Sequence, residues 1–342
     1  MIIHIVCTES LGARGLSCSI ELKDRKIFID PGIALGWSRY GFLPHPFQIA
    51  MGAQLRAEII EALQQASDVI ISHFDGDHCP LGDANPYQLS LNDVTHSLST
   101  SRVWAKGPLQ SPPVQHKRRE ALSQALPVPL IDAEGLKSGP FQFSCAVPHG
   151  PQDRTAHTLM MSRIEEDGFV FVHASDSQLL DGRTIDTLLD WQPDMVLVSG
   201  PPLYRYAAET CRLQRDLAWE NALRLSMHVD TLIVDHHLLR SEEGMQWLRQ
   251  LGRESKNEVL CAADFMHREP LLLEAWRKEL YEWLPVPHGW HEAYARGEAD
   301  WTDYWSRGWQ ALIEHGKIKD VPPTWSRPEL LDGREHPIDD RI

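Results

Sequence analysis

The sequence predicts an α/β fold in which short strands and helices alternate along most of the chain. Apolar runs at 69–71, 169–172 and 231–234 have the length and the β-branched or aromatic content of buried strands. Residues 51–66 instead carry apolar side chains at helical spacing. Each of the three runs is followed within a few residues by a histidine or an aspartate. We therefore expect these polar groups to gather where the strands end.

The run at 69–71 ends at a dense group of possible metal ligands. The group consists of His73, Asp75, Asp77 and His78, which place two imidazoles and two carboxylates within six residues. It could be a polar turn whose aspartates cap a helix and whose histidines lie in solvent. However, four such side chains at the end of a buried strand repel and desolvate one another unless a cation is present. The segment therefore indicates a metal site on a loop that a rigid strand holds.

The spacing His-x-Asp-x-Asp-His resembles the His-x-His-x-Asp-His signature of the metallo-β-lactamase superfamily. Segments before it are similar to an uncharacterised branch of predicted metallo-hydrolases in that superfamily, and the similarity covers residues 1–265. These segments are Glu-Ser-Leu-Gly at 9–12, Ile-Asp-Pro-Gly at 29–32, Arg-Tyr-Gly at 39–41 and Pro-His-Pro at 44–46. The resemblance implies a four-layer αββα sandwich over residues 1–267, with metal ions at one open edge between the sheets.

The resemblance also implies which residues hold the metal ions. One ion would be held by His73, Asp75 and His149, the other by Asp77, His78 and His236, with Asp176 bridging the two. His149 and Asp176 each follow an apolar run, as the metal loop does. His237 is the alternative to His236, because both follow the same apolar run. Asp30 would orient the metal loop from behind, although an Asp-Pro-Gly turn explains this residue equally well.

Two further candidates have less specific signals. His45 stands between two prolines, which stiffen its backbone, so its ring could be aimed at the site. The alternative is a packing or hydrogen-bonding histidine. Lys106 could receive an anionic group of a substrate, or it could belong to a solvated basic face.

The resemblance implies a hydrolase with two divalent metal ions, either zinc or iron and manganese. Hydroxide that bridges the ions would attack an ester, lactone, amide or phosphoester of a small molecule. We expect the catalytic residues to be Asp77, His236, His237 and His45. Protonation of the leaving group would fall to a metal-bound water, to His45 or to whichever of His236 and His237 is not a ligand. The sequence contains no Gly-x-Ser-x-Gly elbow and no phosphate-binding loop.

Asp75 is where the sequence departs from the superfamily signature, which has a histidine at this position. A carboxylate makes the first site richer in oxygen donors, which favours iron or manganese relative to zinc. A di-iron or Fe/Mn oxidoreductase or oxygenase on the same fold is therefore the alternative function. Against it, the sequence has no flavin-binding or Cys-x-x-Cys electron-carrier motif. A metal-binding sensor without turnover is a third hypothesis.

Composition and charge restrict the partners of the 342-residue chain. A formal net charge of −15 disfavours nucleic acid, whose binding depends on Lys and Arg. No run approaches the roughly 18 to 20 apolar residues that span a bilayer, and the N-terminus lacks a basic leader. The six cysteines show no paired spacing. We therefore expect a cytoplasmic protein with a small-molecule substrate and without nucleic-acid or membrane partners, and we leave a homo-oligomer open.

Residues 268–342 differ in composition from the rest of the chain. Five tryptophans fall within thirty residues, namely Trp276, Trp283, Trp290, Trp301 and Trp305. Residues 270–284 and 300–315 have the pattern of helices. The sequence therefore predicts a Trp-rich helical extension over 268–342 that packs on the sandwich. The alternative is a separate partner-binding module.

Overall fold

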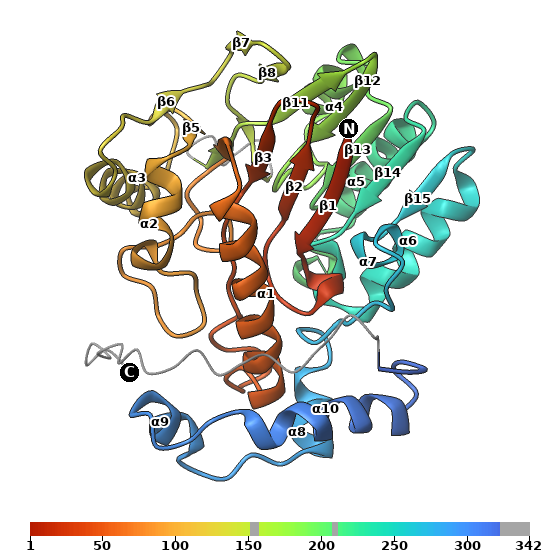
Figure 1. Ribbon diagram of the computed structural model, residues 1–342. Coiled ribbons are helices and arrows are strands. Elements are labelled where there is room, and N and C mark those ends of the chain that lie inside the picture. Colours follow the sequence, from red (N-terminus) through yellow and green to blue (C-terminus); the bar gives the residue numbers. More distant parts are fainter. Residues whose placement is uncertain (151–156, 207–210, 322–342) are drawn as a thin grey trace.

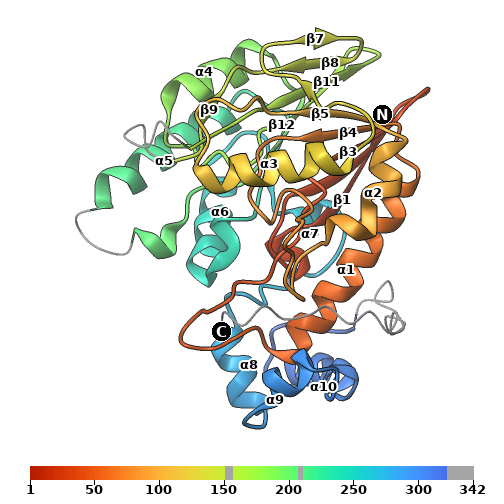
Figure 2. The same ribbon diagram turned by 90° about the vertical axis from the view of Figure 1, so that its left-hand side faces the viewer.

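Two β-sheets face each other, and helices cover the outer face of each sheet (Figure 1). The computed structural model describes residues 1–150, 157–206 and 211–321. Figure 2, turned by a quarter, shows the helices of the first half in front of the first sheet and the second sheet behind it. The predicted four-layer αββα sandwich is therefore confirmed.

The first sheet contains six strands in the order of the sequence. They are β1 (Ile2–Cys7), β2 (Ser17–Glu21), β3 (Lys26–Ile29), β4 (Asp68–Ile71), β5 (Arg102–Ala105) and β6 (Ile131–Asp132). The first three strands pair antiparallel, whereas β3 to β6 run parallel to one another. Since the carboxyl ends of parallel strands meet at one edge, the segments that follow β3 and β4 lie side by side.

The second sheet contains seven strands in the order β15-β14-β13-β12-β11-β8-β7. They are β7 (Lys137–Ser138), β8 (Phe141–Phe143), β11 (Ser162–Glu166), β12 (Phe169–His173), β13 (Met195–Val198), β14 (Thr231–Val234) and β15 (Glu258–Leu260). Strands β12 to β15 are parallel, and the others pair antiparallel. Two short strands, β9 (Val147–Pro148) and β10 (Thr158–Leu159), form a separate antiparallel hairpin.

Helices of each half of the chain cover the sheet of the same half. The first sheet carries α1 (Pro46–Gln64), α2 (Leu91–Ser99) and α3 (Pro113–Ala125). The second carries α4 (Gly182–Asp190), α5 (Arg212–Ser226) and α6 (Glu242–Glu254), and the short α7 (Ala262–Phe265) follows β15. Helix α1 begins at Pro46, five residues before the predicted start at 51, because the backbone before it already carries a side-chain cap.

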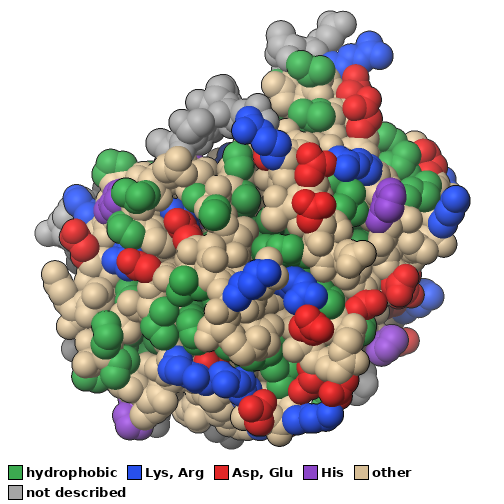
Figure 3. Space-filling model, turned by 90° about the horizontal axis from the view of Figure 1, so that it is seen from above, with side chains coloured by type: hydrophobic (Ala, Val, Ile, Leu, Met, Phe, Trp, Pro, Cys, Tyr) green, Lys and Arg blue, Asp and Glu red, His purple; other side chains and the backbone are tan. Residues whose placement is uncertain are grey.

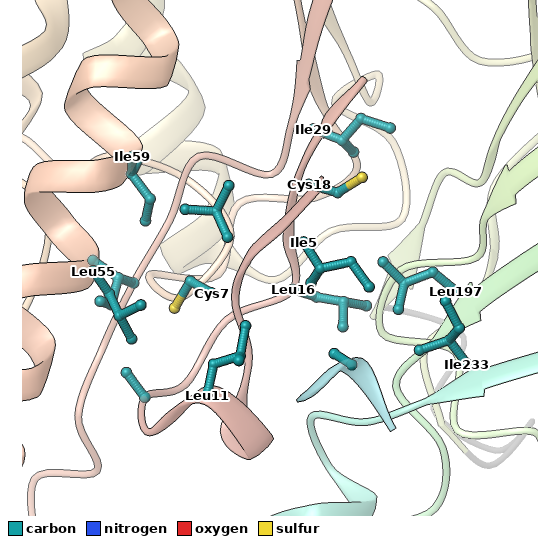
Figure 4. Packing of buried hydrophobic residues seen from close by; sticks show 14 of the residues in the cluster. Ile5, Cys7, Leu11, Leu16, Cys18, Ile29, Leu55, Ile59, Leu197 and Ile233 are labelled. Atoms are coloured by element: carbon teal, nitrogen blue, oxygen red, sulfur yellow. The ribbon is translucent and has the colours of Figure 1, made fainter. Parts of the chain in front are cut away.

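The core fills the space between the two sheets and the space under α1. In Figure 4, Ile5 points from the first sheet toward Leu197 and Ile233 of the second, whereas Cys7 lies on the side of Leu55 in α1. A bulge in the register between Ile5 and Cys7 explains why two residues that are two apart face opposite sides. Burial of each large aliphatic side chain contributes about 1.5 to 3 kcal/mol.

The described part of the C-terminal segment, up to residue 321, forms three helices. They lie at one end of the sandwich (Figure 1). They are α8 (Arg277–Trp283), α9 (Trp290–Ala295) and α10 (Thr302–Glu314). Phe47 of α1 lies edge-on to Trp309 at 5.3 Å, and one hydrophobic cluster includes both the sandwich and these helices. The first of these helices is shorter than the predicted 270–284, and residues 322–342 of the predicted extension lie outside the described residues.

A buried guanidinium joins the C-terminal helices to the loop before α1. Arg277 is fully buried and donates to the carbonyl oxygens of Gly36 at 2.5 Å and Phe42 at 3.2 Å. It also donates to Gln48 Oε1 at 3.1 Å and to Glu274 Oε2 at 2.6 Å. Burial raises the pKa of Glu274, but Arg14 and Arg277 overcome this effect, so the pKa is lowered and the carboxylate stays charged. The loop before α1 is therefore held by the C-terminal segment.

The surface at the opposite end carries mixed charges. Figure 3 shows acidic and basic side chains interspersed on that face, without a large field of one sign. In the part of the chain that the structure describes, no helix has the length and apolar content needed to cross a membrane.

His45 is buried at the start of α1 and bonds on both sides of its ring. Its Nδ1 accepts from the Phe47 N–H at 3.1 Å, and its Nε2 donates to the Leu284 carbonyl at 2.8 Å. Tyr281 and Tyr304 meet the ring edge-on. Burial lowers the pKa of His45 to about 4, against the opposing hydrogen bond to Leu284. His45 therefore caps α1 against the C-terminal helices, which is the packing and hydrogen-bonding role that the sequence analysis named as the alternative, and its ring is not aimed at the site.

We expect acid to weaken the fold through His45. The unfolded imidazole takes up a proton below its usual pKa of 6.5, whereas the folded ring does so only near 4. The neutral His45 ring therefore contributes fully to the free energy of unfolding above pH 6.5. This contribution falls as the pH drops toward 4, and about 2 kcal/mol of it is lost at pH 5. Urea unfolding at pH 7.5 and 5.0 should show a smaller pH effect for His45→Asn than for the parent. Parallel pH dependence of the two proteins would contradict this assignment.

Candidate metal centre

Segments that follow strands of both sheets bring their polar residues to one buried cluster. The loop 73–78 follows β4, Asp176 follows β12, and His236 with His237 follows β14. His149 follows the short strand β9. The imidazole rings of adjacent members lie 4.3 to 5.8 Å apart between their centroids. The strand ends therefore converge as the apolar runs indicated.

The carboxylate of Asp176 lies between two groups of ligands. The first group contains His73, Asp75 and His149, and the second contains Asp77, His78 and His236. Its Oδ1 is 3.3 Å from His78 Nε2 and 3.2 Å from His236 Nε2. Its Oδ2 is 3.0 Å from His149 Nε2 and 3.2 Å from His237 Nε2. Burial raises the pKa of Asp176, but the neighbouring histidines, His236 first, lower it well below its usual value. Asp176 is therefore an ionised carboxylate that both groups share.

Four of the six distances between the ligand atoms of the second group are close to those of a tetrahedral metal site. His78 Nε2 and His236 Nε2 are 3.4 Å apart, and Asp77 Oδ2 is 3.5 Å from His236 Nε2. Asp176 Oδ1 completes the group at 3.2 to 3.3 Å. Four donors at about 2.0 to 2.2 Å from one ion at tetrahedral angles lie about 3.3 to 3.6 Å apart. These residues therefore fit one divalent ion.

In the first group, the Nε2 atom of His73 has a lone pair without a hydrogen-bond partner among the described residues. His73 Nε2 lies 3.5 Å from Asp75 Oδ2 and 3.7 Å from Asp176 Oδ2, and this buried nitrogen has no hydrogen-bond partner among the described residues. Ligand atoms of His73, Asp75, His149 and His157 all lie within 4.8 Å of one another. A buried polar atom without a partner is costly, and a metal ion at this position would satisfy it. The first group thus also fits a divalent ion.

Asp30 holds two of the histidines from behind, where the family resemblance places it. Its Oδ2 accepts from His78 Nδ1 at 2.9 Å and from Ser72 Oγ at 2.6 Å. Since Ser72 Oγ donates to Asp30, it can accept from His73 Nδ1 at 3.0 Å. Burial raises the pKa of Asp30, but the bond from His78 helps to lower it overall. Both histidines are therefore held with Nε2 directed at the cluster.

Glu9 performs the same task for His236. Its Oε2 lies 2.6 Å from His236 Nδ1, and its Oε1 accepts from Arg240 Nε. Arg240 Nη2 lies 2.8 Å from His236 Nε2 and 3.3 Å from Asp77 Oδ2. All three groups are buried. A carboxylate thus fixes the His236 ring, and a guanidinium lies beside the second group.

Three residues at the site have left-handed backbone. The φ angles are 49° at Asp30, 49° at Ser175 and 42° at His236. Such strain costs on the order of 1 to 3 kcal/mol per residue and is concentrated at functional sites. Successive side chains of an extended segment point to opposite sides, but the turn at His236 lets both His236 and His237 reach the cluster. The two adjacent histidines therefore face different ligand groups.

His157 also lies in the cluster, although the sequence analysis did not select it. Its Nε2 is 3.2 Å from Asp75 Oδ2, and its ring stacks on that of His149 at 4.1 Å. Gln115 Nε2 contacts both Asp75 Oδ1 at 2.9 Å and His157 Nε2 at 3.0 Å. Burial raises the pKa of Asp75, but the neighbouring His157 and His73 rings lower it well below its usual value.

Two residues that the sequence analysis selected do not reach the cluster. His45 caps α1, as described above. Lys106 is fully buried, and its Nζ donates to the carbonyl oxygens of Leu109 at 2.6 Å and Gly107 at 3.2 Å. It also pairs with Glu134 at 3.1 Å. Lys106 therefore fixes the loop after β5 and has no free donor directed at a substrate among these contacts.

Gly32 allows the loop after β3 to pack directly on the metal loop. A Cβ atom at this position would lie 2.3 Å from the His78 nitrogen and 2.4 Å from the Cys79 nitrogen. Both are backbone atoms and cannot rotate away. The Asp-Pro-Gly segment therefore combines a carboxylate that orients His78 with a glycine that lets the two loops touch.

Comparison with known proteins found no matching family model. The chain is 46% identical to a UPF0282 protein of Methanosarcina mazei over 306 residues, which cover 89% of this chain and 99% of the relative. It is 31% identical to a UPF0282 protein of Methanopyrus kandleri, with 80% and 96% covered. A UPF0282 protein of Korarchaeum cryptofilum is 30% identical, with 82% and 94% covered.

Similar solved structures belong to the metallo-β-lactamase superfamily, which the sequence motifs resemble. An isothiocyanate hydrolase from Delia radicum gut bacteria has a TM-score of 0.42 at 13% identity, covering 79% of this chain and 94% of that chain. The dizinc quorum-quenching lactonase AidC has a TM-score of 0.36 at 15% identity, covering 56% and 73%.

We expect Gly32→Ala to weaken metal binding about tenfold or more, in the range caused by disturbing groups that orient metal ligands. The added methyl group must displace the backbone at His78. Gly182→Ala is the matched control, because its Cβ meets no atom within 4 Å. Metal content after dialysis against a graded series of chelator concentrations measures the effect, and far-UV circular dichroism checks the fold. Equal metal retention by the two variants would contradict the close packing at Gly32.

Proposed function

The chain belongs to the UPF0282 family, and we propose that it is a metal-dependent hydrolase with two divalent ions. The substrate class is an ester, lactone, amide or phosphoester of a small molecule. The observation that carries the proposal is Asp176, whose two oxygens each face a separate group of imidazole and carboxylate ligands. A carboxylate shared in this way suits two adjacent ions better than one.

The ligand groups favour hydrolysis on chemical grounds. Two divalent ions bound here would lower the pKa of a water molecule and polarise the carbonyl or phosphoryl group to be cleaved. Asp77, His78 and His236 would hold one ion, and His73, Asp75 and His149 would hold the other. Asp30 and Glu9 occupy the Nδ1 atoms of His78 and His236, so that the Nε2 atoms face the cluster.

His237 is the residue to which we assign proton transfer. Its Nε2 hydrogen-bonds Asp176 Oδ2 at 3.2 Å, so the hydrogen of a neutral ring lies on that atom. Its buried Nδ1 then carries a lone pair, and it has no hydrogen-bond partner in the part of the chain that the structure describes. Burial and the charge of Arg240 lower the pKa of His237 well below its usual value. The ring is therefore neutral near pH 7, and Nδ1 is the atom through which it would take part in proton transfer.

A second candidate function is redox chemistry at iron or at iron and manganese. The observation that favours it is Asp75, whose carboxylate lies with three imidazoles in the first group. The low pKa of Asp75 keeps this carboxylate charged, and anionic oxygen donors favour iron and manganese. The metal that the protein retains from its own host distinguishes the two functions.

The test is hydrolysis by metal-depleted and reconstituted protein. A chelator should abolish turnover of a panel that contains p-nitrophenyl acetate, an acyl-homoserine lactone and bis-p-nitrophenyl phosphate. Zn²⁺ or Mn²⁺ should restore turnover of at least one class. We expect Asp176→Asn to lower kcat/KM about 100-fold or more, because one ligand that serves both ions is lost. Asp24→Asn, at an exposed aspartate, is the control.

Two results would count against hydrolysis. If Asp176→Asn keeps the metal content and turnover of the parent, the shared carboxylate is not part of the site. If the protein from its host holds two irons, absorbs visible light and turns over none of the panel, the redox function replaces the hydrolase.

A further inference from the structure

We propose that His157 is a ligand of the first ion. Its imidazole takes the place of the histidine that the superfamily signature has at position 75, where this chain has an aspartate. The first ion would then be held by His73, Asp75, His149 and His157. This inference rests on the proposed function only in requiring that the protein bind metal. It assigns a ligand that the signature does not contain and that lies beyond the metal loop.

The β9–β10 hairpin delivers His149 and His157 together. Thr158 pairs with Pro148, and the His149 N–H donates to the His157 carbonyl at 3.1 Å. The two histidines therefore stand opposite each other at the end of the hairpin. Their rings are nearly parallel, at 10° and 4.1 Å between centroids, and the His73 ring lies 6.3 Å from that of His157. Three imidazoles thus surround the Asp75 carboxylate.

The amide of Gln115 indicates which atoms carry hydrogen. Its nitrogen lies 2.9 Å from Asp75 Oδ1 and 3.0 Å from His157 Nε2. An amide nitrogen only donates, so His157 Nε2 accepts with a lone pair. Rotating the amide would instead bring its oxygen against the Asp75 carboxylate, and two acceptors would then face each other. His157 Nε2 is therefore free of hydrogen in this arrangement and is able to ligate a metal.

A second contact of His157 points to a cation. Its Nε2 lies 3.2 Å from Asp75 Oδ2, where a lone pair faces a charged oxygen without a hydrogen atom between them. The nearby His73 Nε2 has no hydrogen-bond partner among the described residues. Acceptors that converge in this way repel one another unless a cation lies among them. An ion would take over the lone pair of His157, while Gln115 would keep its bond to Asp75 Oδ1.

The replacement changes the charge of the first site without reducing its number of imidazoles. A signature with histidine at position 75 would give three neutral imidazoles with His73 and His149. With His157, this chain has three imidazoles and the Asp75 carboxylate, which adds one negative charge. A site of this composition binds a divalent ion of the first transition series more firmly than two imidazoles and one carboxylate would.

The experiment is a ligand exchange between positions 157 and 75. We would measure the number and affinity of bound Co²⁺ and Zn²⁺ by competition with a chelator, and the Co²⁺ absorption bands, for the parent, His157→Ala, Asp75→His and the double variant. His157→Ala should weaken the binding of one of the two ions about tenfold or more and leave the affinity for the other unchanged. In the double variant, the new imidazole at position 75 should restore most of that affinity. His288→Ala, at an exposed histidine between α8 and α9, is the control.

Each outcome decides the proposal. Two ions bound by His157→Ala with the affinity of the parent would overturn the inference and leave the proposed hydrolase intact. Failure of the double variant to recover affinity would show that His157 does not substitute for position 75. A parent protein that binds no metal would overturn both the inference and the proposed function. Should His157→Ala lose its circular dichroism signal, His157→Gln, which retains a polar side chain of similar length, takes its place in the same comparison.

Discussion

The metal centre depends on the hydrogen bonds that the buried carboxylate of Asp30 accepts. It accepts hydrogen bonds from the backbone and side chain of Ser72 and from His78, which follow β4 of the first sheet, and from Ser175, which follows β12 of the second. A buried charge is tolerated only when its hydrogen bonds are complete. Asp30 therefore fixes the distance between the two sheets at the edge where the ligands meet. Loss of the Ser72 hydroxyl would leave the Asp30 charge less compensated and would release the His73 imidazole at the same time.

The predicted sandwich and the convergence of the strand ends could be derived because both leave local patterns in the sequence. An apolar run followed by His73 or Asp176 is visible without a structure, whereas the layer order needed the family resemblance. Glu9 could not be assigned, because its partner His236 lies 227 residues away. Its Glu-Ser-Leu-Gly segment did contribute to the resemblance, and this was the one signal that could have identified it. His157 follows no apolar run, and only the pairing of β9 with β10 brings it to the site.

Single polar residues on loops gave the least reliable expectations. His45 and Lys106 carry groups suited to catalysis or substrate binding, and the sequence offers nothing to separate these uses from structural ones. In the structure both bond to the backbone, His45 to the Leu284 carbonyl oxygen and the Phe47 N–H, and Lys106 to the Leu109 carbonyl oxygen. The His45 bond depends on how two distant segments cross, and the Lys106 bond depends on the path of the loop after β5. Neither leaves a periodic trace in the sequence. Buried histidines and lysines of this kind satisfy carbonyl groups that helices and strands leave unpaired.

The guanidinium of Arg277 has a consequence for the evolution of the chain. The boundary at residue 267 is a change in composition, but Arg277 crosses it with bonds to Gly36 and Phe42. A gene shortened at this point would leave carbonyl oxygens and Gln48 without their donor, and it would expose the apolar surface around Phe47 to water. The tryptophan-rich segment is therefore not an interchangeable module. Lineages that keep the sandwich in this form must also keep the segment or rebuild the loop that it supports.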